Sequence, residues 1–310
     1  MDFALVFPGQ GSQSVGMMAP YDSLNEVRNT FSQASEVLGF DLWDMAQQGP
    51  AETLNLTVNT QPLLLTAEVA IYRAWRAAHG PEPKAMAGHS LGEYAALVAA
   101  EALSFPDALR TVRFRAEAMQ QAVPEGTGSM AAILGMDDER IRQVCRDAAQ
   151  GEVLEPANFN SPGQVVIAGH KAAVSRGAAL ATERGARKVM PVAMSVPSHC
   201  SLMKPAAEKL RDFIAEIRID RPRISIIHNA DLRAITDPAE IKVALVRQLF
   251  SPVRWVDTVK TLTAQGITHF LESGPGKILT GMNKRIDGVQ QAIVLSDADA
   301  IRQAIALLAQ

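Results

Sequence analysis

Short apolar segments alternate with helical segments along most of this chain. Residues 3–7 (FALVF) and 85–87 have the composition of buried strands, and residues 62–79 carry the end signals of a helix. This alternation is typical of an α/β fold built on a mostly parallel sheet, because each helix carries the chain back to start the next strand. We therefore predict an α/β protein.

Two helices are predicted on either side of the strand at residues 85–87. Pro62 is expected in the first turn of the earlier helix, where its missing N–H costs nothing, and Gly80 is expected just past its end. Ser104 and Asp107 have the spacing of a capping box, which predicts a second helix over residues 104–121.

The middle of the chain has a different order of elements. Strands are predicted at residues 130–134, 153–158, 164–169 and 187–194, and helices at residues 137–150 and 171–184. This βαββαβ order is the ferredoxin-like arrangement. We therefore expect a small inserted domain over residues 127–195 and a main domain formed by residues 1–126 and 196–310.

Composition restricts the class of protein and its partners. A chain of 310 residues that is 47% hydrophobic can bury a large core. Its net charge of −3 comes from interspersed acidic and basic residues, which argues against a nucleic-acid partner. No apolar stretch is long enough to span a bilayer, and the apolar N-terminal run is too short for a signal peptide, so we expect a cytoplasmic protein with no membrane partner.

Two cysteines, Cys145 and Cys200, are present without any paired spacing. Neither a disulfide framework nor a cysteine-based zinc site is therefore indicated, and we expect two free thiols.

Ser90 is the strongest candidate for a catalytic residue. It lies in Gly88-His89-Ser90-Leu91-Gly92, between an apolar strand and a predicted helix. A Gly-x-Ser-x-Gly turn in that context leaves the serine hydroxyl exposed at the start of the helix. The following amide, that of Leu91, is placed to stabilise the oxyanion formed when the serine attacks a carbonyl.

A serine nucleophile needs a base, and histidine is the usual one near neutral pH. Among the six histidines, His199 follows the inserted domain in Pro197-Ser198-His199, at the expected edge of a crevice. Its position alone leaves its role open. His89 is interpreted as a local packing residue, and Cys200 has no nucleophile elbow around it.

Four motifs together resemble the malonyl-CoA:acyl carrier protein transacylase family over essentially the whole chain. They are Phe7-Pro8-Gly9-Gln10-Gly11-Ser12-Gln13, Gly88-His89-Ser90-Leu91-Gly92-Glu93, Pro197-Ser198-His199 and Glu272-Ser273-Gly274-Pro275-Gly276. The resemblance implies an α/β-hydrolase-like large domain with a ferredoxin-like small domain and a site between them. That expectation agrees with the order of elements above.

The resemblance also implies roles for individual residues. Ser90 is expected as the nucleophile and His199 as the general base, oriented by the backbone carbonyl of Gln248. The backbone N–H groups of Gln10 and Leu91 are expected to form the oxyanion hole. The residues alone favour the interpretation of Gln248 as an ordinary polar helix residue, so its role here rests on the resemblance. Gly9-Gln10-Gly11 lacks the lysine and spacing of a phosphate-binding loop, so nucleotide use is not indicated.

Arg115 is the expected selector of the acyl group. An arginine fork can bind the free carboxylate of malonyl with two hydrogen bonds, and acetyl lacks that carboxylate. Helical spacing favours Arg115 only narrowly over Arg113, which could pair with Glu117 on the helix surface. The resemblance decides for Arg115, although Ala116 stands where the family usually has glycine.

The activity implied is a ping-pong transfer of malonyl from malonyl-CoA to the phosphopantetheine thiol of holo acyl carrier protein, supplying fatty acid synthesis, with polyketide synthesis left open. No metal or bound cofactor is expected, because coenzyme A is the substrate and the partner carries the phosphopantetheine. We also expect a monomer. Lys277, Lys284 and Arg285 are candidates for a basic patch facing the acidic carrier.

Two other functions stay open at this stage. A serine esterase or thioesterase would use the same Ser90 and His199, but such hydrolases place an acid between serine and histidine in chain order, and none is evident here. A carrier-binding module without activity is the third possibility, and it leaves the nucleophile elbow unexplained.

Overall fold

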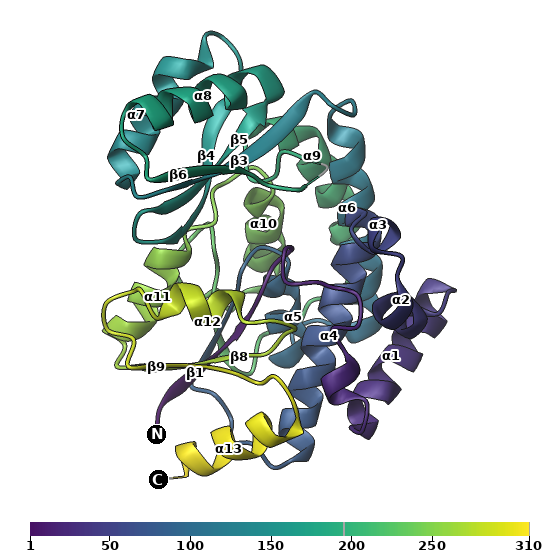
Figure 1. Ribbon diagram of the computed structural model, residues 1–310. Helices are drawn as coiled ribbons and strands as arrows, with labels where there is room; N and C mark the ends of the chain where they lie inside the picture. Colours follow the sequence, from purple (N-terminus) through teal and green to yellow (C-terminus); the bar gives the residue numbers. More distant parts are fainter. Residues whose placement is uncertain (195, 310) are drawn as a thin grey trace.

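A parallel and an antiparallel sheet organise the computed structural model, which describes residues 1–194 and 196–309 (Figure 1). The larger sheet has five strands in the order β7-β2-β1-β8-β9, and every neighbouring pair is parallel. Its strands are β1 (Phe3–Phe7), β2 (Ala85–Gly88), β7 (Ser225–Ile227), β8 (His269–Glu272) and β9 (Gln291–Val294). The predicted α/β class and mostly parallel sheet are confirmed.

The alternation of side chains along β1 explains why helices cover both faces of this sheet. Phe3, Leu5 and Phe7 belong to a core shared with α4 (Thr57–Ala77), α5 (Gly92–Ala99) and α6 (Phe105–Ala122). Ala4 and Val6 face a second core, shared with α11 (Trp255–Ala264) and α12 (Ile278–Asn283). Both faces of β1 are therefore apolar, as expected of a central parallel strand.

The four-stranded antiparallel sheet has the order β4-β5-β3-β6 and lies at the top of Figure 1. Its elements are β3 (Gly128–Leu134), α7 (Asp138–Ala149), β4 (Leu154–Ser161), β5 (Gln164–His170), α8 (Lys171–Glu183) and β6 (Lys188–Pro191). The chain order is βαββαβ, so the ferredoxin-like arrangement is confirmed. The division into domains at residues 127 and 195 stays a prediction, and residue 195 itself lies outside the described residues.

The remaining helices surround the larger sheet. They are η1 (Ala19–Tyr21), α1 (Asn25–Leu38), α2 (Leu42–Gln48), α3 (Ala51–Leu54), η2 (Ser201–Met203), α9 (Lys204–Ala215), α10 (Pro238–Gln248) and α13 (Ala298–Leu308). Sequence reasoning did not identify α1, whose N-cap residue Leu24 makes no side-chain capping bond. Among the described helices, none combines the length and the apolar composition that a membrane crossing requires.

The predicted start of α4 at Pro62 is wrong, because the helix begins at Thr57 and Pro62 lies inside it. Proline there leaves the carbonyl of Val58 without its usual N–H partner four residues later. The Arg113 guanidinium on α6 donates to that carbonyl at 3.1 Å. The neighbouring helix therefore supplies the hydrogen bond that the proline removes.

The predicted cap of α6 is confirmed. The Ser104 hydroxyl accepts a hydrogen bond from the Asp107 N–H at 3.2 Å and donates to the Asp107 carboxylate at 2.7 Å. This cap fixes the start of the helix that carries Arg115 toward the end of β2.

Candidate active site

Ser90 lies on a sharp turn between β2 and α5, with a left-handed backbone φ of 53°. Glycine is required on both sides of it. A Cβ on Gly88 would lie 1.9 Å from the carbonyl carbon of Gly92, and a Cβ on Gly92 would lie 2.2 Å from the carbonyl oxygen of Phe7. The close backbone approach that bends the chain at Ser90 therefore excludes any side chain at these two positions.

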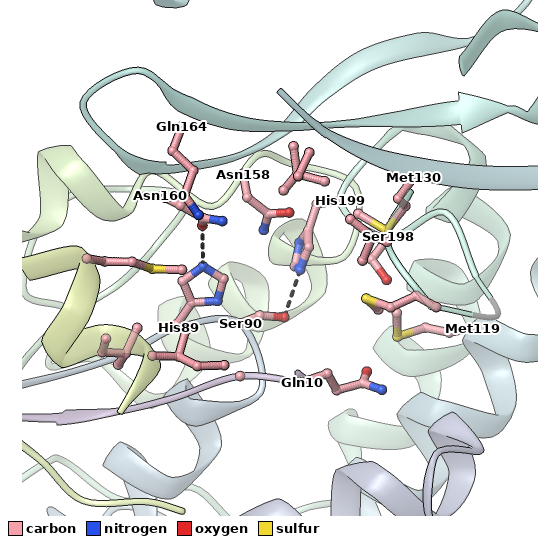
Figure 2. Close-up of a pocket in the computed structure, with 18 residues that line it drawn as sticks. Gln10, His89, Ser90, Met119, Met130, Asn158, Asn160, Gln164, Ser198 and His199 are labelled. Carbon is pink, nitrogen blue, oxygen red and sulfur yellow. Dashed lines mark hydrogen bonds between the residues drawn. The ribbon is translucent and has the colours of Figure 1, made fainter. Parts of the chain in front are cut away.

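His199 meets Ser90 from a distant part of the chain. Its Nε2 lies 2.7 Å from the Ser90 hydroxyl, and its Nδ1 lies 2.9 Å from the carbonyl oxygen of Gln248 (Figure 2 shows the first contact). A carbonyl only accepts hydrogen bonds, so Nδ1 carries the proton and Nε2 presents a lone pair to the serine. The predicted pairing of Ser90, His199 and the Gln248 carbonyl is thus present in the geometry.

The surroundings of His199 keep the imidazole neutral. Burial, followed by the positive charge of Arg115, lowers the pKa of His199 to about 3. A neutral imidazole at pH 7 can accept the proton of a serine hydroxyl.

Arg115 lies beside the same hydroxyl and is only 1% exposed. Its Nη2 lies 3.2 Å from Ser90 Oγ and donates to Gln248 Oε1 at 3.0 Å, while its Nη1 donates to Gln61 Oε1 at 2.8 Å. No carboxylate pairs with this guanidinium in the described residues, and its Nε has no hydrogen-bonding partner there. The site thus contains a buried cation without a partner anion, which is costly unless a ligand supplies one.

Arg113, the rival candidate on the same helix, points elsewhere. Its Nε forms an ion pair with Glu117 at 2.6 Å. The Arg113 side chain is 35% exposed and the Glu117 side chain is 44% exposed. The sequence-based preference for Arg115 therefore agrees with the geometry, although spacing alone separated the two only narrowly.

Gln10 and Leu91, the predicted oxyanion donors, lie at the ends of neighbouring strands. Gln10 follows β1, and Leu91 directly precedes α5, which follows β2. Within the part of the chain that the structure describes, neither backbone N–H donates a hydrogen bond to another residue. Both amides are thus available to an oxyanion, and their role stays a prediction.

Ser90, His199 and Gln10 line a cavity of about 290 Å³ between the two sheets, whereas Arg115 and Leu91 lie behind its lining residues. Gln10, Ser90 and His89 line it from the parallel sheet, and Met130 and Asn160 line it from the antiparallel sheet (Figure 2). A substrate in this cavity would contact both sheets.

Sequence reasoning undervalued His89. Its Nε2 lies 2.9 Å from Asn160 Oδ1, which links the nucleophile turn to β4 across the cavity (Figure 2). Its ring also packs 5.6 Å from that of Trp255, so the predicted packing role is only part of its environment. Burial lowers the pKa of His89 as well. No local signal in the sequence indicates a partner 71 residues away.

Glu93, His228 and Asn229 were also missed. Asn229 Oδ1 accepts a hydrogen bond from the Ser90 N–H at 2.8 Å. Glu93 Oε1 lies 2.5 Å from His228 Nδ1, and all three residues are buried. Glu93 belongs to the GHSLGE motif, which is the only signal that could have drawn attention to this group.

Both cysteines are free, as predicted, and the structure shows that both are buried. Burial raises the pKa of Cys200 to about 12, so its thiol stays protonated at neutral pH and does not compete with Ser90 as a nucleophile. Among residues 1–194 and 196–309, no group of three or more His, Cys, Asp or Glu side chains could hold a metal ion. The expectation of chemistry without a metal or cofactor stays a prediction.

The sequence and the fold match a known class of enzymes. Residues 4–301 match the family described as the acyl transferase domain. A malonyl CoA-acyl carrier protein transacylase from Haemophilus influenzae is 56% identical over 299 residues, covering 95% of each chain.

Solved structures agree with this match. An acyl-carrier-protein S-malonyltransferase from Burkholderia pseudomallei is 51% identical with a TM-score of 0.97, covering 99% of this chain and all of the other. A type II PKS acyl-carrier protein in complex with its malonyl-transacylase contains a chain 49% identical, with a TM-score of 0.97 over 99% of this chain and all of the other. This chain belongs to the malonyl-CoA:acyl carrier protein transacylase family, as its four motifs predicted.

Proposed function

We propose that this chain transfers the malonyl group of malonyl-CoA to the phosphopantetheine thiol of holo acyl carrier protein, through an ester on Ser90. The observation that carries the proposal is the unpaired Arg115 guanidinium, which lies 3.2 Å from the Ser90 hydroxyl in a buried site. A substrate that offers both an acyl carbon to Ser90 and a carboxylate to Arg115 satisfies both groups. Malonyl thioesters have this combination.

In the first half-reaction, Ser90 Oγ attacks the thioester carbonyl while His199 Nε2 takes the hydroxyl proton. The Gln10 and Leu91 amides donate to the oxyanion of the tetrahedral intermediate. When this intermediate collapses, the carbon–sulfur bond breaks and His199 returns the proton to the sulfur of coenzyme A. The product is malonyl-Ser90 and free coenzyme A.

In the second half-reaction the same groups act in reverse. His199 takes the proton of the phosphopantetheine thiol, the sulfur attacks the ester carbonyl, and the proton returns to Ser90 Oγ. The backbone carbonyl of Gln248 keeps the imidazole in the required tautomer through both steps, so no acidic residue is needed behind the histidine.

The malonyl-carrier product would supply chain extension in fatty acid synthesis. We propose that the enzyme works in the cytoplasm as a monomer without a bound metal or cofactor. The close relatives named as malonyl CoA-acyl carrier protein transacylases support the substrate pair. The structure of a malonyl-transacylase in complex with its acyl-carrier protein supports the carrier as partner.

The experiment that tests this function is intact-mass spectrometry of the protein mixed with malonyl-CoA, followed by a chase with holo acyl carrier protein. We expect a malonyl adduct that Ser90→Ala abolishes and that the carrier discharges. No adduct would favour a binding module. An adduct lost to water at the same rate with and without carrier would favour a thioesterase, and either result would overturn the transferase.

A further inference from the structure

Glu93 is a buried carboxylate that contacts neither substrate space nor solvent. It lies in the first turn of α5 with 1% exposure and is not among the residues that line the cavity. Its Oε1 lies 2.5 Å from His228 Nδ1, and a carboxylate only accepts, so the imidazole donates this hydrogen bond. Its Oε2 accepts from Gln248 Nε2 at 2.8 Å and from the Asn229 N–H at 3.2 Å.

Two of these partners, Asn229 and Gln248, connect Glu93 to the backbone of Ser90 by hydrogen bonds. Asn229 Oδ1 accepts from the Ser90 N–H at 2.8 Å, and Gln248 Nε2 donates to the Ser90 carbonyl oxygen at 2.9 Å. The two side-chain amides thus hold both sides of the Ser90 backbone, which has the left-handed φ of 53°. Such a conformation persists only where surrounding contacts hold it.

Glu93 also determines which end of the Gln248 amide faces Arg115. The Gln248 NH₂ group donates to Glu93 and to the Ser90 carbonyl, so only Oε1 remains for the guanidinium, which it contacts at 3.0 Å. A reversed amide would place its NH₂ group against the cation. Glu93 forms no direct ion pair with Arg115, and its effect on this buried cation is exerted from the far side of the Gln248 amide.

We propose that Glu93, held by His228, is a positioning residue that aligns Ser90 and Arg115 together through the side-chain amides of Asn229 and Gln248. This proposal rests on the proposed function for the role of Arg115 and on geometry alone for the role of Ser90. It assigns to the glutamate of the GHSLGE motif a role beyond its place in the first turn of α5.

The test begins with Glu93→Ala and Glu93→Gln, measured against the matched control Glu68→Gln. Glu68 is equally buried, lies on α4, and has no hydrogen-bonding partner for its carboxyl oxygens in the described residues. We expect E93A to slow malonyl transfer to Ser90 about 100-fold, because small misalignments of reacting groups cost rates of that order. E93Q still accepts from Gln248 and Asn229 and should recover to within about tenfold of wild type, whereas E68Q should match wild type.

A double-mutant cycle separates positioning from general loss of stability. Because Glu93 acts through Asn229 as well as through the Gln248 amide, E93A should slow malonyl transfer by a smaller factor in the Q248A background than in wild type. Losses that multiply would overturn the proposal, as would E93A activity within about twofold of wild type. Should E93A fail to fold, Glu93→Asp replaces it. The shorter side chain keeps the carboxylate but moves it away from the Gln248 side-chain amide and the Asn229 backbone N–H. E93D at the wild-type rate would also overturn the proposal.

Labelling of Ser90 by a neutral fluorophosphonate distinguishes this proposal from the proposed function. The probe needs neither malonyl nor Arg115, so it reports the alignment of Ser90 alone. We expect E93A to be labelled about 10-fold or more slowly than wild type and E68Q at the wild-type rate. Wild type that labels but transfers no malonyl would overturn the proposed function only, and E93A that labels as fast as wild type would overturn the positioning of Ser90.

Discussion

Ser90 and His199 both have left-handed backbone conformations, with φ angles of 53° and 62°. For residues with a side chain, such conformations cost about 1–3 kcal/mol each and persist where tertiary contacts enforce them. For His199 one such contact is the hydrogen bond from its N–H to the Leu249 carbonyl at 3.1 Å. The reacting atoms are thus held at 2.7 Å by backbone positions as much as by side-chain rotamers.

Replacement of Arg115 by alanine should change which acyl group Ser90 accepts. Without the guanidinium, the malonyl carboxylate would enter a buried site unpaired, at a cost of about 3 kcal/mol, or roughly a 100-fold slower acylation by malonyl-CoA. Acetyl-CoA has no carboxylate and should lose little. Intact-mass time courses with both donors check this, and an unchanged malonyl-to-acetyl ratio would assign the selectivity elsewhere.

The pH dependence of acylation should reflect the buried histidine. Because the pKa of His199 is lowered to about 3 from its usual 6.5, the imidazole remains a base well below pH 6.5. We expect the acid limb of kcat/KM for malonyl-CoA to lie below pH 6.5 and to move upward in Arg115→Met, since the Arg115 charge contributes to the lowered pKa. A limb at pH 6.5 in both proteins would contradict this account.

At the scale of elements, α4 and α6 place the site by an exchange of hydrogen bonds. Pro62 removes one bond inside α4, and Arg113 from α6 replaces it at the Val58 carbonyl. The two helices are thereby connected one turn from Gln61 on α4, which also holds Arg115. An irregularity in one helix thus contributes to the position of the other.

This exchange predicts a non-additive effect on stability. Arg113→Met should lower the free energy of unfolding by about 1 kcal/mol, the usual net value of such a hydrogen bond. In a Pro62→Ala background the new N–H can reach the Val58 carbonyl, so the same change should cost less. Urea denaturation of the four proteins measures the cycle, and equal costs in both backgrounds would show that Arg113 acts otherwise.

The short helix α12 predicts where the carrier docks. Ile278, Leu279 and Met282 line the cavity, while Lys277 and Lys284 at the helix ends are exposed. Arg285 is already engaged, since it donates to Gln164 and to the Pro162 carbonyl. Of the predicted basic patch, the two lysines therefore remain for an acidic partner.

Reversal of both charges, Lys277→Glu with Lys284→Glu, should weaken the second half-reaction only. We expect the KM for holo carrier protein to rise about tenfold at low salt, with a smaller difference at high salt, because such surface contacts are screened. The rate of malonyl-Ser90 formation should be unchanged. Transfer kinetics at two ionic strengths provide the measurement, and an unaltered KM would place the docking surface elsewhere.

At the scale of the whole molecule, the site exists only because two sheets of different topology meet. The antiparallel sheet is covered by α7 and α8 on one face (Figure 1), with which it forms a core. Met130 and Val166 of its other face line the cavity. This junction buries His199 and partly buries His89. Folding therefore takes both imidazoles out of full contact with water at one place.

Stability should consequently decrease as the solution becomes acidic. The pKa values of His89 and His199 are lowered in the fold, so below pH 6.5 the unfolded chain binds protons that the folded chain does not. The stabilisation is complete above pH 6.5 and is lost as pH falls toward the folded pKa values. Burial raises the pKa of Glu68, which acts in the opposite direction: its contribution is present below pH 4.5 and is lost as pH rises through the folded value.

A comparison of wild type with His199→Gln isolates the histidine, because both proteins retain Glu68. Urea denaturation at pH 7.5 and pH 5.0 should show a larger loss for wild type than for the variant. Equal losses would mean that His199 does not contribute to the pH dependence.

The amino-acid sequence by itself determined most of the strands and helices and the nucleophile. Alternating apolar runs, turn glycines and capping residues act over a few positions, so the α/β class, the βαββαβ order, the Ser104 cap and the turn at Ser90 follow from local spacing.

The start of α4 did not follow from local spacing, because a proline within a helix is tolerated only when another element satisfies the freed carbonyl. Arg115 was separated from Arg113 by burial, which spacing does not record. The contacts of Asn229 with Ser90 and of His228 with Glu93 join residues 139 and 135 positions apart. Only the packing of the parallel sheet brings such residues within hydrogen-bonding distance, and for that reason the tertiary structure decided how the nucleophile is held.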